Sequence, residues 1–371
     1  VAFMVDGVST LLGTISDERG TYLPKSIRVP EFLPELLMVV FHLSSCDAFV
    51  VGACGHGEIA ALVEGILHVP NEAPDYLGDD TLALLTWATL VRLTTYREVC
   101  IVLNEDFKGD PPADVQEFSG SLADLVALAA LTYVSDYFVT TRVNLVHHCI
   151  VEAALSAIAN TSVFAEDLCI HTSTRFFAVF ERSAKSVNSR RGSRIGAVWL
   201  PYFLEIMNYI VQYQYATNSH MAYGILTRLA VFKELQTMTA EPAARLAAMA
   251  APPSASPGGA DPATPTPNGS ASPRSECSAA SADVLTESQV ATWQRDLKQH
   301  LDPLMVLLDE VVPHLEAEVE RRELTGPDEV KSLLPRSLLG LLPRPPAFVM
   351  RNLRYNELTH RACEHCLVAD G

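Results

Sequence analysis

Apolar side chains recur at helical spacing over residues 203–211, and this periodicity constrains the fold more than any other feature of the chain. Spacings of i, i+3, i+4, i+7 and i+8 place the apolar members on one face of an α-helix. The opposite face carries Glu205, Asn208 and Gln212. Pro201 suits a first turn, where its missing N–H has no intrahelical partner. The segment therefore predicts a packed helix with the apolar face Phe203, Ile206, Met207, Ile210 and Val211.

A second segment keeps the same spacing for more than four turns. Acidic residues such as Asp309 and Glu316 fall between its apolar positions, as expected of a solvated face. Pro313 lies inside the pattern and predicts a kink, because proline lacks the N–H that the helix needs. The apolar members are Leu304, Leu307, Leu308, Val311, Val312, Leu315 and Val319.

Long apolar segments separated by short polar joints fill most of the remaining chain, and strand-like alternation is rare. Residues 109–117 include Pro111 and Pro112 and indicate a loop. Successive helices predict an all-α fold, an irregular helical-repeat (armadillo/HEAT-like) solenoid without a fixed period. The apolar segments cover roughly residues 32–52, 58–69, 81–104, 122–138, 143–160 and 162–182.

Residues 240–283 differ in kind, since they are rich in Ala, Pro, Ser, Gly and Thr. Such a segment buries too little apolar surface to offset its ordering entropy, so we expect a disordered insertion. The expected organisation is a helical-repeat block at 1–239, the linker at 240–283, a C-terminal helical segment of the same domain at 284–350 and a divergent tail at 351–371. Because the chain starts at Val1, we expect it to be part of a longer protein.

The net charge of −17 argues against a general nucleic-acid-binding protein, which needs a basic face for phosphates. The longest apolar run, Leu125–Val134, is about half of the ~20 residues that a membrane-spanning helix needs. The eight cysteines are scattered, which suits a reducing cytosol better than a disulfide framework. We expect no bound nucleic acid, cofactor or small-molecule substrate.

One combination of residues resembles a catalytic motif. His56 and Glu58, together with Cys363 and Cys366, match the His-x-Glu and Cys-x-x-Cys of zinc nucleobase deaminases. That motif has proline before its first cysteine, where this chain has Ala362.

The C-terminal cysteines suggest a simpler metal site. Cys363 and Cys366, with His360 and His365 nearby, can supply ligands for zinc, although a closed structural site needs four. Two thiols near the end of the chain are the plainer interpretation. The alternative hypothesis is a zinc-binding module, or a zinc-dependent hydrolase or deaminase, that uses Cys363 and Cys366.

Three blocks of residues resemble a known family. The first comprises Asn208-Tyr-Ile-Val-Gln-Tyr-Gln-Tyr215, Asn218-Ser219, Ala222-Tyr223 and Phe232. The second comprises Leu324-Thr325, Glu329, Leu339-Gly340-Leu341-Leu342-Pro343 and Pro345. The third comprises Leu90–Leu103 with Arg97 and Asn104, then Ala123-Asp124-Leu125. Together they resemble the high-temperature-induced dauer-formation family, which consists of Golgi-associated proteins related to dymeclin, over most of residues 80–350.

This resemblance implies a non-enzymatic scaffold or adaptor that is cytoplasmic and peripherally associated with Golgi membranes. It implies a role in secretory-pathway trafficking, in secretory-granule (dense-core vesicle) or protein sorting, with other trafficking proteins as partners. Attachment to the Golgi membrane would use parts absent from this chain, such as the family's myristoylated N-terminal glycine. The family supplies no catalytic or metal-binding residue to carry over.

Five residues of the first block are candidates for a family signature or an interaction surface. Side chains with apolar bodies and polar tips suit a buried turn between helices, where backbone groups freed at a helix end need partners. The same side chains could instead line a groove that binds a partner. The five are Gln212, Tyr213, Gln214, Asn218 and Tyr223.

Overall fold

The computed structural model describes residues 2–20, 32–72, 79–109, 111–112, 115, 118–138, 145–188, 194–241, 287–324, 326–337 and 350–351. Regular structure in these ranges is helical, and an isolated antiparallel bridge joins Asp106 to Ser121. The predicted all-α class is confirmed. The helices are α1 (Ala2–Gly20), α2 (Leu33–Leu43), α3 (Asp47–His56), α4 (Ile59–Glu72), α5 (Asp79–Leu93), α6 (Arg97–Val102), α7 (Leu122–Tyr137), α8 (Leu145–Ser162), α9 (Ile170–Asn188), α10 (Arg194–Tyr213), α11 (Ser219–Leu226), α12 (Leu229–Ala240), α14 (Glu287–Arg322) and α15 (Pro327–Ser337).

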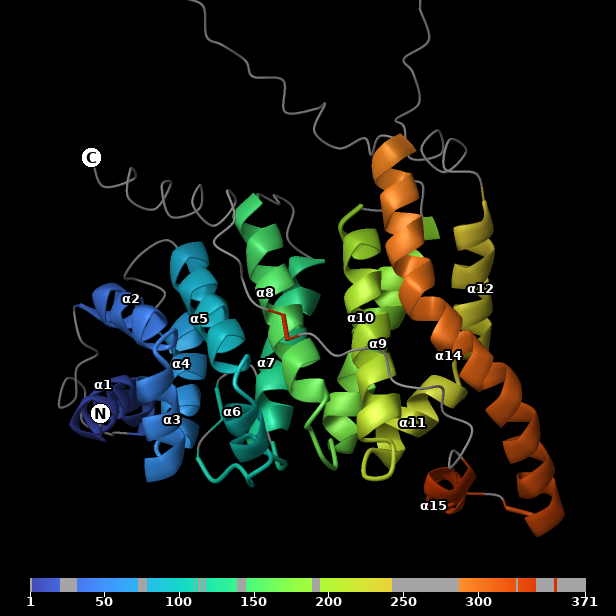
Figure 1. The fold of residues 1–371 in the computed structure, drawn as a ribbon, viewed down its shortest axis with the longest axis horizontal. Coiled ribbons are helices and arrows are strands. Elements are labelled where there is room, and N and C mark those ends of the chain that lie inside the picture. Colours follow the sequence, from blue (N-terminus) through green and yellow to red (C-terminus); the bar gives the residue numbers. More distant parts are fainter. Residues whose placement is uncertain are drawn as a thin grey trace, which may run out of the picture.

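The helices form an array that follows the order of the chain, from α1–α4 at one end to α12 and α14 at the other (Figure 1). Successive neighbours across the array are α1 with α4, α4 with α5, α5 with α8, α8 with α10 and α10 with α14. The helices that contact one another are separated by a varying number of helices along the chain, so these contacts do not define a repeat unit. The irregular helical-repeat solenoid therefore stays a prediction.

Helices α7–α10 form the middle of the array and bury most of their side chains. Phe203 of α10 packs against Phe176 and Phe180 of α9, with ring centroids 5.3 and 6.1 Å apart. Helix α11 lies close against α9 at Gly224, where a Cβ atom would lie 2.0 Å from the Phe177 ring. Glycine is required there because the phenyl ring fills the space that any side chain would need.

The apolar face predicted for α10 is confirmed, since all five of its members are buried. The opposite face differs from a solvent-facing one, because Glu205 and Asn208 are buried as well. Helix α10 packs against α8, α9 and α14, so little of its circumference is left for solvent. Asn208 satisfies its amide by donating to the carbonyl oxygens of Leu204 at 2.9 Å and His300 of α14 at 2.6 Å.

Helix α14 packs along α10 and α12, and its predicted pattern is confirmed. Its apolar members are buried or half-buried, whereas Asp309, Glu310, Glu316 and Glu320 are exposed. The helix continues through both Pro303 and Pro313. Its ribbon bends part-way along its length (Figure 1), as expected of a helix with internal proline.

The N-terminal end of the array exposes apolar side chains. Most of the large hydrophobic side chains that are exposed in the described residues belong to α1–α3 or directly precede α2. No single described helix combines the length and apolar character needed to cross a bilayer; α2 and α3 together do so by length and composition, with a bend of 99° between them. The exposed residues are Phe3, Met4, Phe32, Met38, Val39 and Val51.

Several sequence predictions fall outside the described residues. Almost all of the 240–283 linker and of the 351–371 tail lies there, including Cys363 and Cys366. The proposed division into four segments stays a prediction. The predicted loop at 109–117 lies between α6 and α7, and its described residues are not helical.

Candidate functional site: the joint between α10 and α11

Residues 214–218 join α10 to α11 and carry the centre of the first family block. Backbone hydrogen bonds continue through the joint, from Gln214 N to Ile210 O at 2.8 Å and from Asn218 N to Gln214 O at 3.1 Å. Asn218 is the N-terminal cap residue of α11, and its own carbonyl accepts from Ala222 N. The turn is therefore tight, and its Gln214 and Asn218 side chains contact the neighbouring α8–α9 loop.

Asn218 is fully buried, and its side-chain amide is satisfied on both atoms. Oδ1 accepts from the N–H of Leu168 at 2.8 Å. Nδ2 donates to the carbonyl oxygens of Ala165 at 2.8 Å and Gln214 at 3.0 Å. One amide thus links the joint to the loop, and such satisfied buried polar groups specify a single local arrangement.

The loop between α8 and α9, residues 163–169, receives three further side chains. Gln214 Nε2 donates to the carbonyl of Val163 at 3.0 Å. Asn104 donates to the carbonyl of Phe164 at 2.8 Å and accepts from the N–H of Glu166 at 2.9 Å. Asp124 accepts from the N–H of Cys169 at 2.9 Å. We call Asn104, Asp124, Gln214 and Asn218 the loop clamp.

Asp124 has a second role that fixes its position. It is fully buried and forms a capping box with Ser121, in which each side chain accepts a hydrogen bond from the other's backbone N–H. The carboxylate therefore caps α7 with one oxygen and holds the loop with the other. Asp167, within the loop, has a φ of 52°, a left-handed conformation that is uncommon for residues other than glycine.

The remaining three signature residues are half-buried. Tyr213 lies near Tyr209, with ring centroids 6.3 Å apart. Tyr223 lies beneath the ammonium group of Lys331 in α15, 5.6 Å from the ring centroid. Gln212 has a buried Oε1 without a hydrogen-bond partner among the described residues. Gln214 is half-buried as well, so four of the five signature residues keep some contact with solvent.

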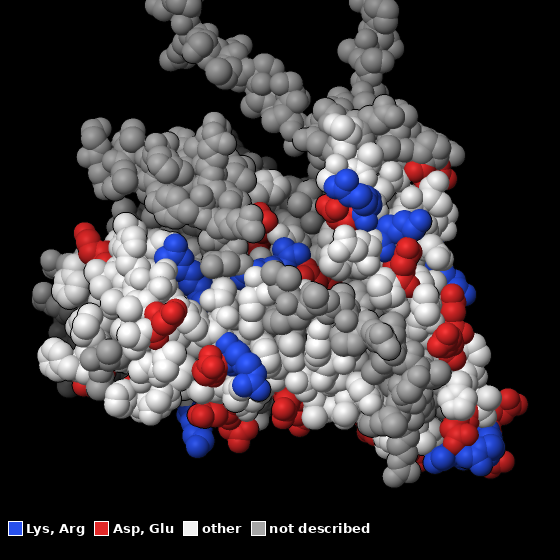
Figure 2. Space-filling model, viewed as in Figure 1, with Lys and Arg blue, Asp and Glu red and all other residues white. Residues whose placement is uncertain are grey.

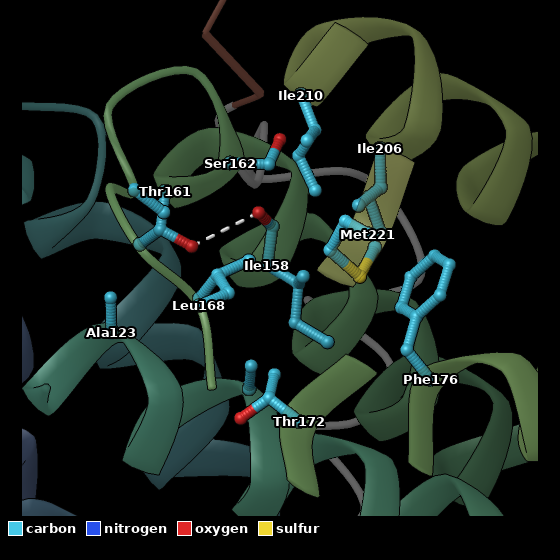
Figure 3. Close-up of a pocket in the computed structure, with 12 residues that line it drawn as sticks. Ala123, Ile158, Thr161, Ser162, Leu168, Thr172, Phe176, Ile206, Ile210 and Met221 are labelled. Atoms are coloured by element: carbon cyan, nitrogen blue, oxygen red, sulfur yellow. Dashed lines mark hydrogen bonds between the residues drawn. The ribbon is translucent and has the colours of Figure 1, made fainter. Parts of the chain in front are cut away.

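A pocket beneath the joint is lined by apolar side chains, among them Ile158 of α8, Ile210 of α10 and Met221 of α11 (Figure 3). The polar lining group Thr161 donates its hydroxyl to the carbonyl of Ile158 at 3.0 Å. The cavity is only about 10 Å³, at the lower limit for a single water. The joint therefore covers packed core, and this pocket has no room for an organic ligand.

The residues of the zinc hypothesis are not brought together in the described part of the chain. His56 is exposed at the end of α3, where Gly57 closes the helix with a φ of 76°, and Glu58 follows it. Their proposed partners Cys363 and Cys366, with His360 and His365, lie outside the described residues. Within the described ranges, no three metal-ligating side chains gather closely enough to hold a metal ion.

Acidic and basic side chains are interspersed on the face shown in Figure 2, with wide uncharged areas between them. Over the described residues of this face, charges of a single sign do not form a broad field. Such a surface suits contacts with other proteins better than contacts with the phosphates of nucleic acids.

Comparison with known proteins identifies the family of this chain. The family model of dymeclin, the Dyggve-Melchior-Clausen syndrome protein, matches residues 2–360. The chain belongs to the dymeclin family. The resemblance stated from the sequence is therefore confirmed, and its first and third blocks meet at one loop in this dymeclin-family fold.

Two curated relatives are both described as Protein HID1. The mouse protein is 24% identical over 243 residues, which cover 65% of this chain and 29% of that protein. The human protein is 25% identical over 244 residues, with the same shares covered. The dymeclin-family chain thus spans less than a third of the length of these relatives. No solved structure gives a significant match.

Sequence reasoning missed a second polar cluster, on α8 and α10. Arg351 pairs with the carboxylate of Glu205, which also accepts from the hydroxyl of Tyr209 at 2.6 Å. Burial, reinforced by that hydrogen bond, raises the pKa of Tyr209, so its hydroxyl stays a donor. Asn160 of α8 contacts the backbone of Arg351. No local pattern could have shown this cluster, because its partners lie 146 and 191 positions apart.

Proposed function

We propose that this chain is a non-enzymatic scaffold segment of a Golgi-associated protein that acts in secretory-pathway trafficking. Membership of the dymeclin family over residues 2–360 is the observation that carries this proposal. The chain would present a helical surface to other trafficking proteins and would catalyse no reaction. Its place in the cell would be the cytoplasmic side of Golgi membranes, with sorting into secretory granules as the process it serves.

The arrangement of polar groups supports a scaffold. Asn104, Asp124, Gln214 and Asn218 each hydrogen-bond backbone groups of the same molecule through their side chains. They thus stabilise the array and are not free to bind a substrate. The half-buried signature residues outside the loop clamp, Gln212, Tyr213 and Tyr223, remain candidates for an interaction surface.

The exposed apolar side chains of α1–α3 are a second candidate contact region. Met38, Val39 and Val51 lie on the surface of α2 and α3, where exposed apolar groups gather at one end of the array. Gathered apolar groups on a protein surface mark sites of interaction more often than single ones do. We therefore place the partner-binding surface of the scaffold at this end.

Proximity labelling in cells tests both parts of the proposal. The full-length protein that carries this chain, fused to a biotin ligase, should label Golgi trafficking proteins above the level given by the free ligase. Changing Met38, Val39 and Val51 to serine or threonine should reduce that labelling. The matched control changes Ile101, Ile170 and Val306, which are exposed to a similar degree on other helices, and should leave the labelling unchanged.

Labelling of Golgi proteins no stronger than that of the free ligase would contradict the trafficking role. If both triple variants lost labelling equally, the α1–α3 surface would not be the contact region. Thermal unfolding should change little and to a similar extent in the two triple variants, since a single substitution at an exposed site usually changes stability by less than about 0.5 kcal/mol.

A further inference from the structure

Asn160 holds the backbone of a residue from the other end of the chain. Its side chain is almost fully buried in α8. Nδ2 donates to the carbonyl of Arg351 and Oδ1 accepts from the N–H of the same residue, both at 2.8 Å. The short segment that carries Arg351 lies against α8 in Figure 1. An amide that pairs with both backbone groups of one residue recognises an extended chain, as a neighbouring strand would, without reading its side chain.

The side chain of Arg351 is recognised separately. Its Nε donates to Oε2 of Glu205 at 2.9 Å, and its Nη2 contacts the same oxygen. The guanidinium carbon lies 4.1 Å from the centroid of the Tyr202 ring. A carboxylate beside an aromatic face matches the planar, charged guanidinium better than the compact ammonium of lysine.

The groups that receive Arg351 belong to the core of the array. Tyr209 donates to Glu205 at 2.6 Å, and Tyr202 donates to Glu152 at 2.6 Å, so both carboxylates are oriented from α10. The Glu205 side chain is only 7% exposed with Arg351 in place. A carboxylate in this position without a cation is costly, so the site requires a positively charged partner.

We propose that Asn160, Tyr202 and Glu205 form a recognition site for an extended peptide segment that carries an arginine. The chain's own Met350–Arg351 occupies this site, and an arginine-containing segment of another protein binds there when the chain's own segment leaves. The net charge of −17 favours such a basic partner. This site is independent of the proposed role at the Golgi.

A competition experiment on the whole chain tests the proposal. The Arg351→Ala variant vacates the arginine position. A fluorescent peptide with the sequence of residues 347–355 should then bind the variant, as measured by fluorescence anisotropy. The wild-type chain should bind the same peptide about tenfold more weakly or worse, because the tethered segment competes at high effective concentration.

Matched variants separate specific recognition from simple charge attraction. A peptide with Arg351 replaced by lysine keeps the charge and should bind the Arg351→Ala chain about tenfold more weakly, because one charged hydrogen bond and the ring contact are lost. Adding Glu205→Gln to the Arg351→Ala chain should weaken its binding of the arginine peptide by a similar factor. Changing the exposed Glu310 of α14 to glutamine should leave the affinity unchanged.

Equal affinity for the arginine and lysine peptides, or equal affinity with and without Glu205→Gln, would overturn the proposal. Circular dichroism checks that each variant is folded. If Arg351→Ala does not fold, Arg351→Lys serves as the weakened chain, and the arginine peptide should still bind it more tightly than the wild type. Absence of binding to every folded variant would also show that no such site exists.

Discussion

Two buried asparagines hold non-helical backbone in this molecule, and they do so in different settings. Asn218 binds the N–H of Leu168 and the carbonyl of Ala165 in the loop between α8 and α9. Asn160 binds both backbone groups of Arg351. Each amide supplies one donor and one acceptor to a backbone that lacks helical partners.

The settings differ in how the held segment is otherwise attached. The 163–169 loop is joined to helices at both ends and receives four clamp side chains. Arg351 is held by Asn160 and by contacts of its own side chain with Glu205 and Tyr202. The comparison teaches that the same amide chemistry can serve a permanent joint in one place and, under our proposal, an exchangeable contact in another.

Removing Asn218 should have the largest effect on the stability of the fold. Asn218→Ala leaves the buried N–H of Leu168 and the carbonyl of Ala165 without their partner, so we expect a loss of about 3 kcal/mol in unfolding free energy. Chemical denaturation measures it. Asn218→Asp keeps an acceptor for Leu168 but sets a buried carboxylate oxygen against the carbonyl of Ala165, so it should lose at least as much. A loss below about 1 kcal/mol for Asn218→Ala would show that the loop does not depend on this clamp.

Removing Asn160 should have a smaller effect on global stability. Asn160→Ala loses the two bonds to Arg351 and the 3.2 Å bond to the hydroxyl of Thr94. Because the freed backbone groups of Arg351 can reach water, we expect a loss of about 1 kcal/mol. Hydrogen exchange at the Arg351 amide should accelerate strongly in this variant. Unchanged exchange there, or a stability loss equal to that of Asn218→Ala, would erase the difference between the two sites.

The third effect depends on pH and concerns the thiol behind Asn160. Burial raises the pKa of Cys100 from 9.0 to about 12, and its Sγ faces the carbonyl oxygens of Thr94 and Asn160. A raised folded-state pKa gives stability that is complete below pH 9 and is lost progressively as pH rises toward 12. From pH 9 to pH 10 the loss from this group should be roughly 1 kcal/mol.

Comparing the pH dependence of unfolding for the wild type and Cys100→Ala checks this expectation. The variant should show a shallower decline above pH 9, since it lacks the titrating thiol. Alkylation of the native protein should also leave Cys100 unmodified while the exposed Cys46 reacts. Parallel declines in both proteins would mean that the space behind Asn160 is already open to solvent.

Local periodicity was sufficient to predict the inward faces of α10 and α14. Phe203, Ile206 and Ile210 are buried as their spacing indicates, because neighbours on one face of a helix share one environment. Periodicity was insufficient to predict the burial of the opposite face of α10. Glu205 and Asn208 look like solvent-facing residues by pattern, yet α14 and Arg351 cover them. A polar side chain with distant partners cannot be told from a solvated one by spacing alone.

Some predicted helices are divided where the sequence carries no strong breaker. The apolar segment at 32–52 forms α2 and α3, separated at residues 44–46 by a turn in which the buried Ser44 hydroxyl donates to the carbonyl of Phe41. The segment at 81–104 divides in the same way at residues 94–96, where Thr94 and Thr95 donate to carbonyls three residues back. Serine and threonine can thus end helices through local bonds that composition does not reveal.

The candidate site was predicted as a set of residues and not as a geometry. Family resemblance drew attention to Gln214, Asn218, Asn104 and Asp124, but nothing in their order shows that they meet at one loop. Their convergence depends on the packing of α7, α8 and α10 in three dimensions.

The clamped loop also has a consequence for how the chain reaches its native state. Its side-chain partners lie between 45 and 62 positions away in sequence, so the bonds require closure of long segments before they form. The helices on either side can form earlier from local interactions. The time at which the amides of Glu166, Leu168 and Cys169 become protected from hydrogen exchange during refolding should therefore mark the docking of the helices in the middle of the array.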